Sequence, residues 1–397
     1  DPQTNMLVSP VQKKNVTIGS NLKTVSIKFK DTLQPNTTYS IDFGNAIVDI
    51  HEGNILKNFT YTFSTGNYID SFQLRGKVVV AETGKTDSTI LVYLYKNAND
   101  TDVLSKKPDY IERLNGDGIF NFKHLPAANF KIYALKDGDG GKTYNSKTEI
   151  FAFNDADINS SNNSKPVILY AFAEEKEKAG SNAQSSNNAP KKTVDKKLRY
   201  SVSSGSGKGQ DLLSPLEISF TSPLKNYDST KFVLSDTNYK PIPGIRAVLD
   251  TSRTKVTLQQ SWLPEMQYIL TIGKEAVSDS ADLALEKSDT IRFITKKESA
   301  YGSITFRFSN LDLSLHPVIQ FVQSDVVKFS FPVTASEWSR KLFEPGEYEV
   351  RILYDSNQNG KWDPGNYKER IQPERAIGLP QKIAIKADWE NEREISL

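Results

Sequence analysis

The most specific chemical motif in the sequence is a run of oxygen-bearing side chains near the C-terminus, DSNQNGKWD from Asp355 to Asp363. Calcium loops place oxygen ligands at positions 1, 3, 5, 7 and 9, with a glycine at position 6. This run has Gly360 at position 6, so we predict a Ca²⁺ site in the loop. The candidate ligands are Asp355, Asn357, Asn359, Lys361 (through its main-chain carbonyl) and Asp363.

Position 12 of this loop is Asn366, where calcium loops usually have a bidentate glutamate. The site therefore has a weak ligand set unless Glu369 or Glu374 folds back toward it. The alternative is an Asx-rich turn whose side chains bond to their own main chain, with Trp362 packed over it.

A degraded copy of this motif, DGDGGKTYN, begins at Asp137. Gly141 has no side-chain oxygen to offer at position 5, so a plain turn is the favoured reading. If a metal binds here, Glu149 is the expected additional ligand.

Five short runs consist of Asp, then Ser or Thr, then a small or aliphatic residue. They resemble the O-glycosylation sequence of Bacteroidota and would imply export, although three-residue patterns also arise by chance. The candidate acceptors are Thr32, Ser88, Ser229, Ser280 and Thr290.

Composition excludes several other chemistries. The 397 residues contain no Cys, which removes disulfides, thiolate metal sites and a cysteine nucleophile from this chain. The three histidines, His51, His124 and His316, are far apart and form no metal-binding motif. Lys+Arg 50 against Asp+Glu 48 gives a net charge of +2, so bulk charge does not favour nucleic acid as a partner.

The elements that position these residues are predicted to be short antiparallel strands. Apolar and polar residues alternate in stretches such as 24–30, 130–135 and 348–353, as half-buried strands require. Turn sequences such as Asn115-Gly116-Asp117-Gly118 separate them, and long helical patterns are missing. We therefore predict an all-β fold of tandem β-sandwiches.

The two halves of the sequence carry the same signatures in the same order, which indicates an internal duplication. YSIDFG at 39–44 matches YILTIG at 268–273, and FKIYALKD at 130–137 matches YEVRILYD at 348–355. A polar linker at 175–197 separates the halves.

We predict that an Ig-like domain opens each half and that a prealbumin/CNA-B-like sandwich follows it. The first domain is short for an Ig-like unit, so we expect its opening strands to precede residue 1. The predicted ranges are 1–66 (first domain), 67–174 (second), 198–297 (third) and 298–397 (fourth).

Residues 33–54, LQPNTTYSIDFGNAIVDIHEGN, followed by FSTG at 63–66, resemble the SbsA-type bacterial Ig-like domain of Bacteroidota lipoproteins. YALKD at 133–137, EIFAF at 149–153 and YDSNQNGKWDPGNY at 354–367 resemble later parts of the same proteins. The resemblance implies an outer-membrane lipoprotein, at the cell surface or periplasmic face, anchored through an upstream lipidated Cys that this chain does not contain.

The resemblance implies that the protein is a non-enzymatic scaffold. Such a protein would bind a β-barrel and other lipoproteins in an outer-membrane complex that assembles or exports outer-membrane and surface proteins. The alternative is a Ca²⁺-dependent surface adhesin or glycan-binding protein. A hydrolase with paired carboxylates is the third reading, and no pair in the sequence supports it.

Overall fold

The computed structural model describes residues 6–21, 24–49, 51–57, 59–163, 165–176, 198–204 and 209–397. The predicted linker at 175–197 therefore lies outside the described residues from residue 177 onward. The described chain consists of strands, turns and four 3-10 helices of three to five residues. None of the helices in that part of the chain is long and apolar enough to cross a membrane. The predicted all-β fold class is confirmed.

The chain divides into two compact units, each described here by itself. The first unit comprises Asp1–Gly180, Asp312–Thr334 and Glu349–Lys382, and the remaining three segments form the second unit. The first, second, third and fourth domains are residues 1–66, 67–174, 198–297 and 298–397, the ranges predicted from the sequence.

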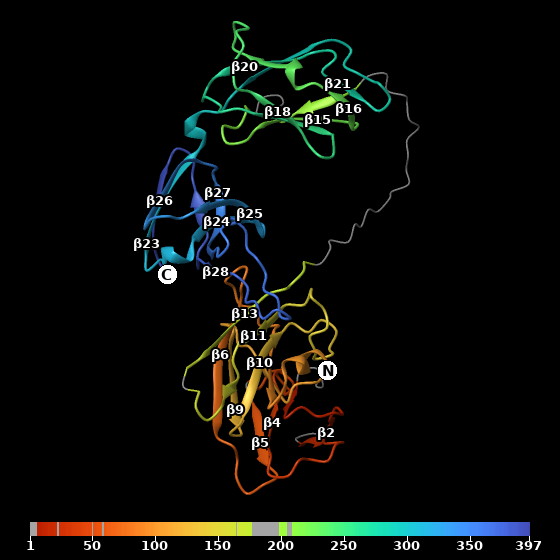
Figure 1. Ribbon diagram of the computed structural model, residues 1–397. Helices are drawn as coiled ribbons and strands as arrows, with labels where there is room; N and C mark the ends of the chain where they lie inside the picture. The colour runs from red at the N-terminus through yellow and green to blue at the C-terminus, as the bar shows by residue number, and fades with distance from the viewer. Residues whose placement is uncertain are drawn as a thin grey trace. The chain divides into compact units, whose positions relative to one another are not determined.

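The first domain contains a three-stranded sheet of order β1-β4-β5 and a hairpin, β2-β3 (Figure 1). Its strands are β1 (Leu7–Ser9), β2 (Thr17–Asn21), β3 (Thr24–Lys28), β4 (Thr38–Asp42) and β5 (Thr60–Ser64). Met6, Ile41 and Phe43 form the buried centre of its small core.

The second domain has one sheet of order β11-β10-β7-β8, with β12 also paired to β10, and another of order β13-β6-β9. Alternate residues on the facing sides build its core, which includes Val92, Ile132 and Phe120. Its elements are β6 (Phe72–Val80), β7 (Leu91–Lys96), η1 (Asp100–Leu104), β8 (Tyr110–Arg113), β9 (Ile119–Leu125), β10 (Asn129–Leu135), β11 (Phe151–Phe153), β12 (Ile158–Asn159) and β13 (Val167–Ala171).

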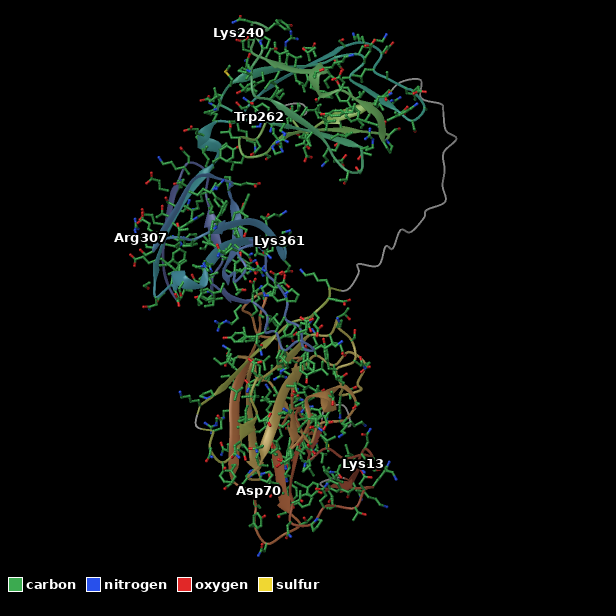
Figure 2. The ribbon with its side chains drawn as sticks, in the orientation of Figure 1. Lys13, Asp70, Lys240, Trp262, Arg307 and Lys361 are labelled. Carbon is green, nitrogen blue, oxygen red and sulfur yellow. The ribbon has the colours of Figure 1, made fainter. Side chains whose placement is uncertain are left out.

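The third domain has sheets of order β14-β15-β19-β18, β17-β20-β22 and β16-β21. Trp262, labelled in Figure 2, is buried in its core and its indole N–H donates to the Ser214 carbonyl at 3.0 Å. Its elements are β14 (Tyr200–Val202), β15 (Leu216–Phe220), β16 (Leu224–Tyr227), η2 (Ser229–Lys231), β17 (Phe232–Ser235), β18 (Arg246–Leu249), β19 (Lys255–Gln259), β20 (Gln267–Ile272), β21 (Val277–Asp279) and β22 (Asp289–Ile294).

The fourth domain repeats the strand order of the second, with sheets β25-β24-β27-β28 and β26-β23-β30, and β29 paired to β27. In both domains the first strand pairs in parallel with the last, β6 with β13 and β23 with β30. Its elements are η3 (Glu298–Ala300), β23 (Gly302–Ser309), η4 (Leu313–Leu315), β24 (Pro317–Gln323), β25 (Val326–Pro332), β26 (Glu337–Phe343), β27 (Gly346–Tyr354), β28 (Arg375–Gly378), β29 (Ile383–Ile385) and β30 (Glu390–Ser396).

A buried tyrosine organises the loop before β4 in the first domain. The Tyr39 hydroxyl accepts a hydrogen bond from the Gln34 N–H at 2.8 Å, and its ring stacks on Phe63 with centroids 5.4 Å apart. Thr65 Oγ1 donates to the Gln34 carbonyl at 2.6 Å. These bonds satisfy loop main-chain groups that would otherwise lose hydrogen bonds to water.

The third domain contains the same arrangement around Tyr268. Its hydroxyl accepts from the Leu263 N–H at 3.2 Å, its ring stacks on Phe293 at 5.7 Å, and Thr295 Oγ1 donates to the Leu263 carbonyl at 2.6 Å. In both domains the tyrosine lies five residues after its N–H donor. Together with the matching strand orders, these contacts confirm the predicted duplication.

Charged groups meet where the first domain packs on β8 of the second. The Arg113 guanidinium pairs with Asp42 at 3.0 Å. Glu112 on the same strand is largely buried, and this desolvation, with a smaller contribution from the Asp42 charge, raises the pKa of Glu112 to about 7.

We predict that this carboxyl makes stability fall as the pH rises. The folded chain holds the Glu112 proton to about pH 7, whereas the unfolded chain loses it near the ordinary value of 4.5. Between these values the folded state binds more protons, so stability declines across that window. Replacing Glu112→Gln should therefore stabilise the first unit at pH 8 by on the order of 2 kcal/mol and have little effect at pH 4.5. Denaturant unfolding at several pH values tests this, with exposed Glu52→Gln as the control; an equal effect of Glu112→Gln at every pH would contradict it.

Candidate functional site

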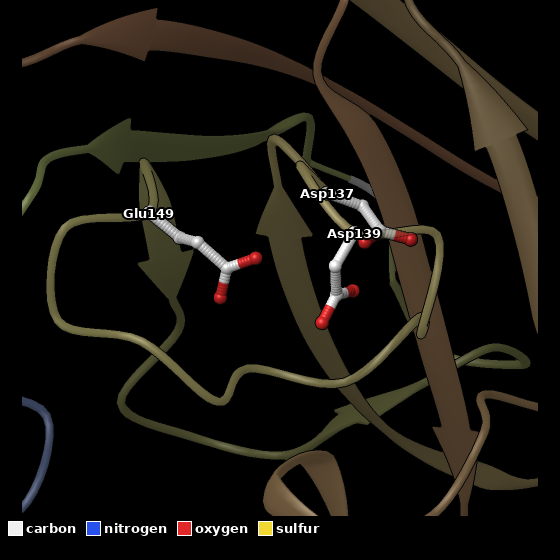
Figure 3. Close-up of side chains that lie close together, drawn as sticks. All are labelled: Asp137, Asp139 and Glu149. Atoms are coloured by element: carbon white, nitrogen blue, oxygen red, sulfur yellow. The ribbon is translucent and has the colours of Figure 1, made fainter.

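Three carboxylates converge on the loop that joins β10 to β11 in the second domain. One oxygen each from Asp137, Asp139 and Glu149 lies within 4.8 Å of the others. Figure 3 shows Glu149 reaching toward the two aspartates from the opposite side of the loop. This spacing suits a hard cation with oxygen ligands, because a cation would relieve the repulsion among the three charges.

The loop main chain and one asparagine hold these carboxylates in place. Asp137 accepts from the N–H groups of Gly140 at 2.8 Å and Lys142 at 2.9 Å. Asp139 accepts from Asn145 Nδ2 and the Gly141 N–H, both at 2.7 Å, and these two bonds hold the pKa of its carboxyl below the ordinary value. Asp139 is therefore held as an anion at neutral pH.

A fully buried hydroxyl lies near Asp137 of this loop but in hydrogen-bond geometry with none of the described residues. The Tyr93 side chain on β7 has no exposed surface, and its hydroxyl finds no partner among the described residues. Burial and then the charge of Asp137 raise the pKa of this hydroxyl, so it stays protonated. A buried hydroxyl of this kind costs stability unless something binds it.

In the fourth domain, the predicted calcium loop between β27 and β28 is closed by its own side chains. Asp355 is almost fully buried and accepts from the N–H groups of Asn359 at 3.2 Å and Gly360 at 2.7 Å. Asn357 and Asn359 each donate a side-chain amide hydrogen to Asp363 Oδ2 at 2.6 Å. The Lys361 N–H donates to Asn359 Oδ1 at 2.7 Å, and Figure 2 labels Lys361 on this loop.

Glu374 folds back onto this loop, as the sequence required for a complete ligand set. Its Oε1 accepts from the Ser356 N–H and hydroxyl at 2.7 Å each, and its Oε2 accepts from the Asp363 N–H at 3.1 Å. Trp362 donates its indole N–H to the Glu374 carbonyl at 2.8 Å. Glu369, the other candidate, forms no hydrogen bond with Asp355 or Asp363 in the described chain.

The structure therefore holds the five predicted ligand residues in one loop, but as an Asx-rich turn in which the amides take up the acceptor oxygens. The carboxylates that converge belong instead to the Asp137 loop, which the sequence favoured as a plain turn. Glu149, which the sequence analysis named as the additional ligand if a metal binds the Asp137 loop, is the residue that the fold brings to Asp137 and Asp139.

The segment that follows the Asp355 loop inserts an aromatic ring into the second domain. Tyr367 is buried in a cluster with Tyr133, Phe151 and Phe153. Its ring meets those of Phe151 and Phe153 edge-on, with centroids 5.0 and 5.2 Å apart. Edge-to-face pairs of this kind add to the stabilisation that burial of the ring already provides.

Polar groups fix the same tyrosine in place. Its hydroxyl donates to the Asp100 carbonyl and shares a 3.1 Å hydrogen bond with the Tyr133 hydroxyl. Its N–H donates to Glu174 Oε1 at 3.1 Å, and the Tyr144 hydroxyl donates to the same oxygen at 3.0 Å. Tyr144 belongs to the Asp137 loop, so Glu174 links the two acidic loops.

Two further side chains extend this contact along β11. The Arg370 guanidinium lies over the Phe153 ring at 4.8 Å and donates to the Asn154 and Asp155 carbonyls at 3.0 Å each. Gln372 donates to the Phe153 carbonyl at 3.2 Å. The sequence did not predict this insertion, although an aromatic residue in the otherwise polar PGNYKER stretch was a usable signal.

The five predicted glycosylation acceptors are all exposed: Thr32, Ser88, Ser229, Ser280 and Thr290. The aspartates of three runs accept hydrogen bonds within local turns. Thr89 donates to Asp87, and Thr230 to Asp228, through both N–H and hydroxyl. Asp279 accepts from the main-chain N–H groups of Ala281 and Leu283. Exposure is what a modification site requires, and the turn bonds equally suit a purely structural role.

Comparison with known proteins identifies the N-terminal domain. Residues 1–65 match the family described as bacterial Ig-like domain, so the chain is an Ig-like domain-containing protein. No curated protein is detectably similar in sequence.

Three solved structures are similar to this chain at low identity and low TM-score. Native alpha-2-macroglobulin from Escherichia coli is 13% identical over 48% of this chain and 90% of that one, with a TM-score of 0.23. The major pilin subunit BcpA of Bacillus cereus is 10% identical over 82% and 99%, with a TM-score of 0.19. The Bacillus anthracis TIE protein is 10% identical over 99% and 68%, with a TM-score of 0.20.

We predict that removing the Tyr367 ring separates the fourth-domain loop from the second domain. Tyr367→Ala leaves a cavity among aromatic rings and should lower the free energy of unfolding of the first unit by about 3 kcal/mol or more. Tyr367→Phe keeps the ring and should lose only about 1 kcal/mol. Guanidinium unfolding measures both, and Tyr68→Ala at an exposed tyrosine is the control. Equal stability of Tyr367→Ala and the control would contradict the role of the ring.

Proposed function

We propose that this chain is a non-enzymatic scaffold and partner-binding subunit of an outer-membrane protein complex, lipid-anchored through an upstream Cys. The complex would contain a β-barrel and other lipoproteins and would assemble or export outer-membrane or surface proteins. The resemblance of residues 33–66 and 354–367 to Bacteroidota lipoproteins supports the location, and the bacterial Ig-like match supports the domain type.

The observation that carries the scaffold role is the insertion of Tyr367 into the second domain. A scaffold must keep its binding surfaces at fixed spacing, and adjacent sandwiches joined only by linkers are expected to move relative to one another. Residues 365–374 instead bring part of the fourth domain into one compact unit with the second. Strands and loops held this way can be presented to partners without a large entropic cost on binding.

Native membranes provide the test of the scaffold role. After mild detergent extraction and size fractionation, the chain should migrate in a stable assembly much larger than itself, with a β-barrel and lipoproteins co-purifying. Tyr367→Ala should weaken that assembly, whereas Tyr68→Ala should not. Migration of the wild-type chain only as a free monomer would contradict the proposal.

A second candidate function, a Ca²⁺-dependent surface adhesin or glycan-binding protein, is favoured by the convergence of Asp137, Asp139 and Glu149. In this reading Ca²⁺ binds the three carboxylates and stiffens the loop between β10 and β11. The five candidate ligands of the Asp355 loop form the alternative cation site, which would need the amides of Asn357 and Asn359 to turn their oxygens inward. Glycans O-linked at the five exposed acceptors would accompany either role at the cell surface.

Calorimetric titration of the full chain with CaCl₂ tests this second function. We expect binding with a dissociation constant of roughly 10⁻⁴ to 10⁻³ M, as in other extracellular modules. Glu149→Gln should abolish it if the Asp137 loop is the site, and Asp363→Asn should do so if the Asp355 loop is. Glu52→Gln serves as the exposed control. Absence of Ca²⁺ binding by the wild-type chain would eliminate the proposal, as would glycan binding that is insensitive to chelators.

A further inference from the structure

A cavity of about 800 Å³ lies within the first unit, between the turn after β6 and the strands β27 and β28. Its apolar wall includes Val322, Val350 and Leu379, and residues of the 82–86 and 378–380 segments also line it. Ligand sites in proteins have volumes of this order and the same mixture of apolar walls with a few polar groups.

One buried cation in this wall has an incomplete set of partners. Arg351 on β27 is 9% exposed, and its Nε–H donates to Gln320 Oε1 at 2.7 Å. Its two terminal amino groups form no hydrogen bond with the described residues, and no carboxylate there forms an ion pair with it. Burial lowers the pKa of this guanidinium, and the charges of Glu82 and Glu349 offset this only in part.

The strand register leaves the outer edge of this guanidinium open. Arg351 lies directly opposite Gln320 on β24 and Gly378 on β28. Gln320 occupies one side, whereas Gly378 has no side chain to cover the other. A Cβ atom at position 378 would lie 3.0 Å from the Thr83 carbonyl oxygen, a tighter contact than side chains usually make, so glycine suits the close approach of these segments.

The lysines of the cavity wall, in contrast, already have partners. Lys85 pairs with Glu349 at 2.6 Å, Lys382 approaches the same carboxylate at 4.0 Å, and Lys176 pairs with Glu82 at 3.2 Å. The wall therefore lacks one negative charge, located at Arg351. A planar carboxylate supplies this charge and matches the two-pronged edge of a guanidinium.

We propose that this cavity binds a peptide segment of a partner protein through one carboxylate seated on the open edge of Arg351. The carboxylate is an acidic side chain or a free C-terminus. A dianionic phosphate is disfavoured because Glu82, Glu349 and Asp325 also line the cavity. The volume exceeds that of a lone carboxylate, and the apolar wall suits the rest of a peptide. This inference deepens the scaffold proposal and rests on it for the partner.

Ligand-observed NMR titration of the full chain at constant ionic strength tests the inference. The probes are acetyl-Ala-Glu-Ala-amide, acetyl-Ala-Gln-Ala-amide and acetyl-Ala-Ala-Ala with a free C-terminal acid. At least one acid probe should bind saturably, with a dissociation constant of about 1 mM or below. It should bind at least tenfold more tightly than the Gln peptide, and comparison of the two acid probes identifies the source of the carboxylate.

Arg351→Gln should reduce acid-probe binding to the level of the Gln peptide. Arg375→Gln, which removes a nearby arginine outside the cavity wall, should leave it unchanged. The comparison of probes on the wild-type chain remains decisive if Arg351→Gln fails to fold. Equal binding of all three probes, or undiminished acid-probe binding by folded Arg351→Gln, would overturn the inference. Neither result would contradict the scaffold proposal, because co-purification from membranes tests that proposal separately.

Discussion

The insertion of Tyr367 into the aromatic cluster of the second domain is the contact on which the first unit depends. It buries a large ring among Tyr133, Phe151 and Phe153 and satisfies its polar groups within the second domain. The contact joins segments more than 200 residues apart in sequence, so closing it costs chain entropy that burial must exceed. Once formed, it brings the Asp355 loop, the Asp137 loop and the Arg351 cavity into a single unit.

Duplication explains why the two acidic loops are comparable and why they differ. Each follows the same strand of the same sheet order, β10 in the second domain and β27 in the fourth. In the first copy, glycines replace side-chain ligands and Glu149 approaches from the far side of the loop. In the second copy, asparagines fill the loop and Glu374 binds its main chain instead. One scaffold thus supports a loop with converging charges and a loop closed by neutral amides.

Much of this architecture could be predicted from local sequence. Alternation of apolar and polar residues predicted the strands, because a half-buried sheet imposes a period of two, and the Tyr39 and Tyr268 motifs revealed the duplication. Contacts between distant segments could not be predicted. The insertion of Tyr367 and the burial of Arg351 opposite Gly378 both depend on which strands pair and which domains touch. Those choices leave no periodic pattern in the chain.

We expect residues 363–374 and the second domain to form one cooperative unit. Hydrogen-exchange mass spectrometry of the wild-type chain tests this most directly, because segments of one cooperative unit open with the same free energy. Peptides covering 363–374 should be as strongly protected as those covering β10 and β11, and denaturant should lower their protection in parallel. Exchange of 363–374 at the rate of an unprotected loop, while β10 and β11 remain protected, would contradict it.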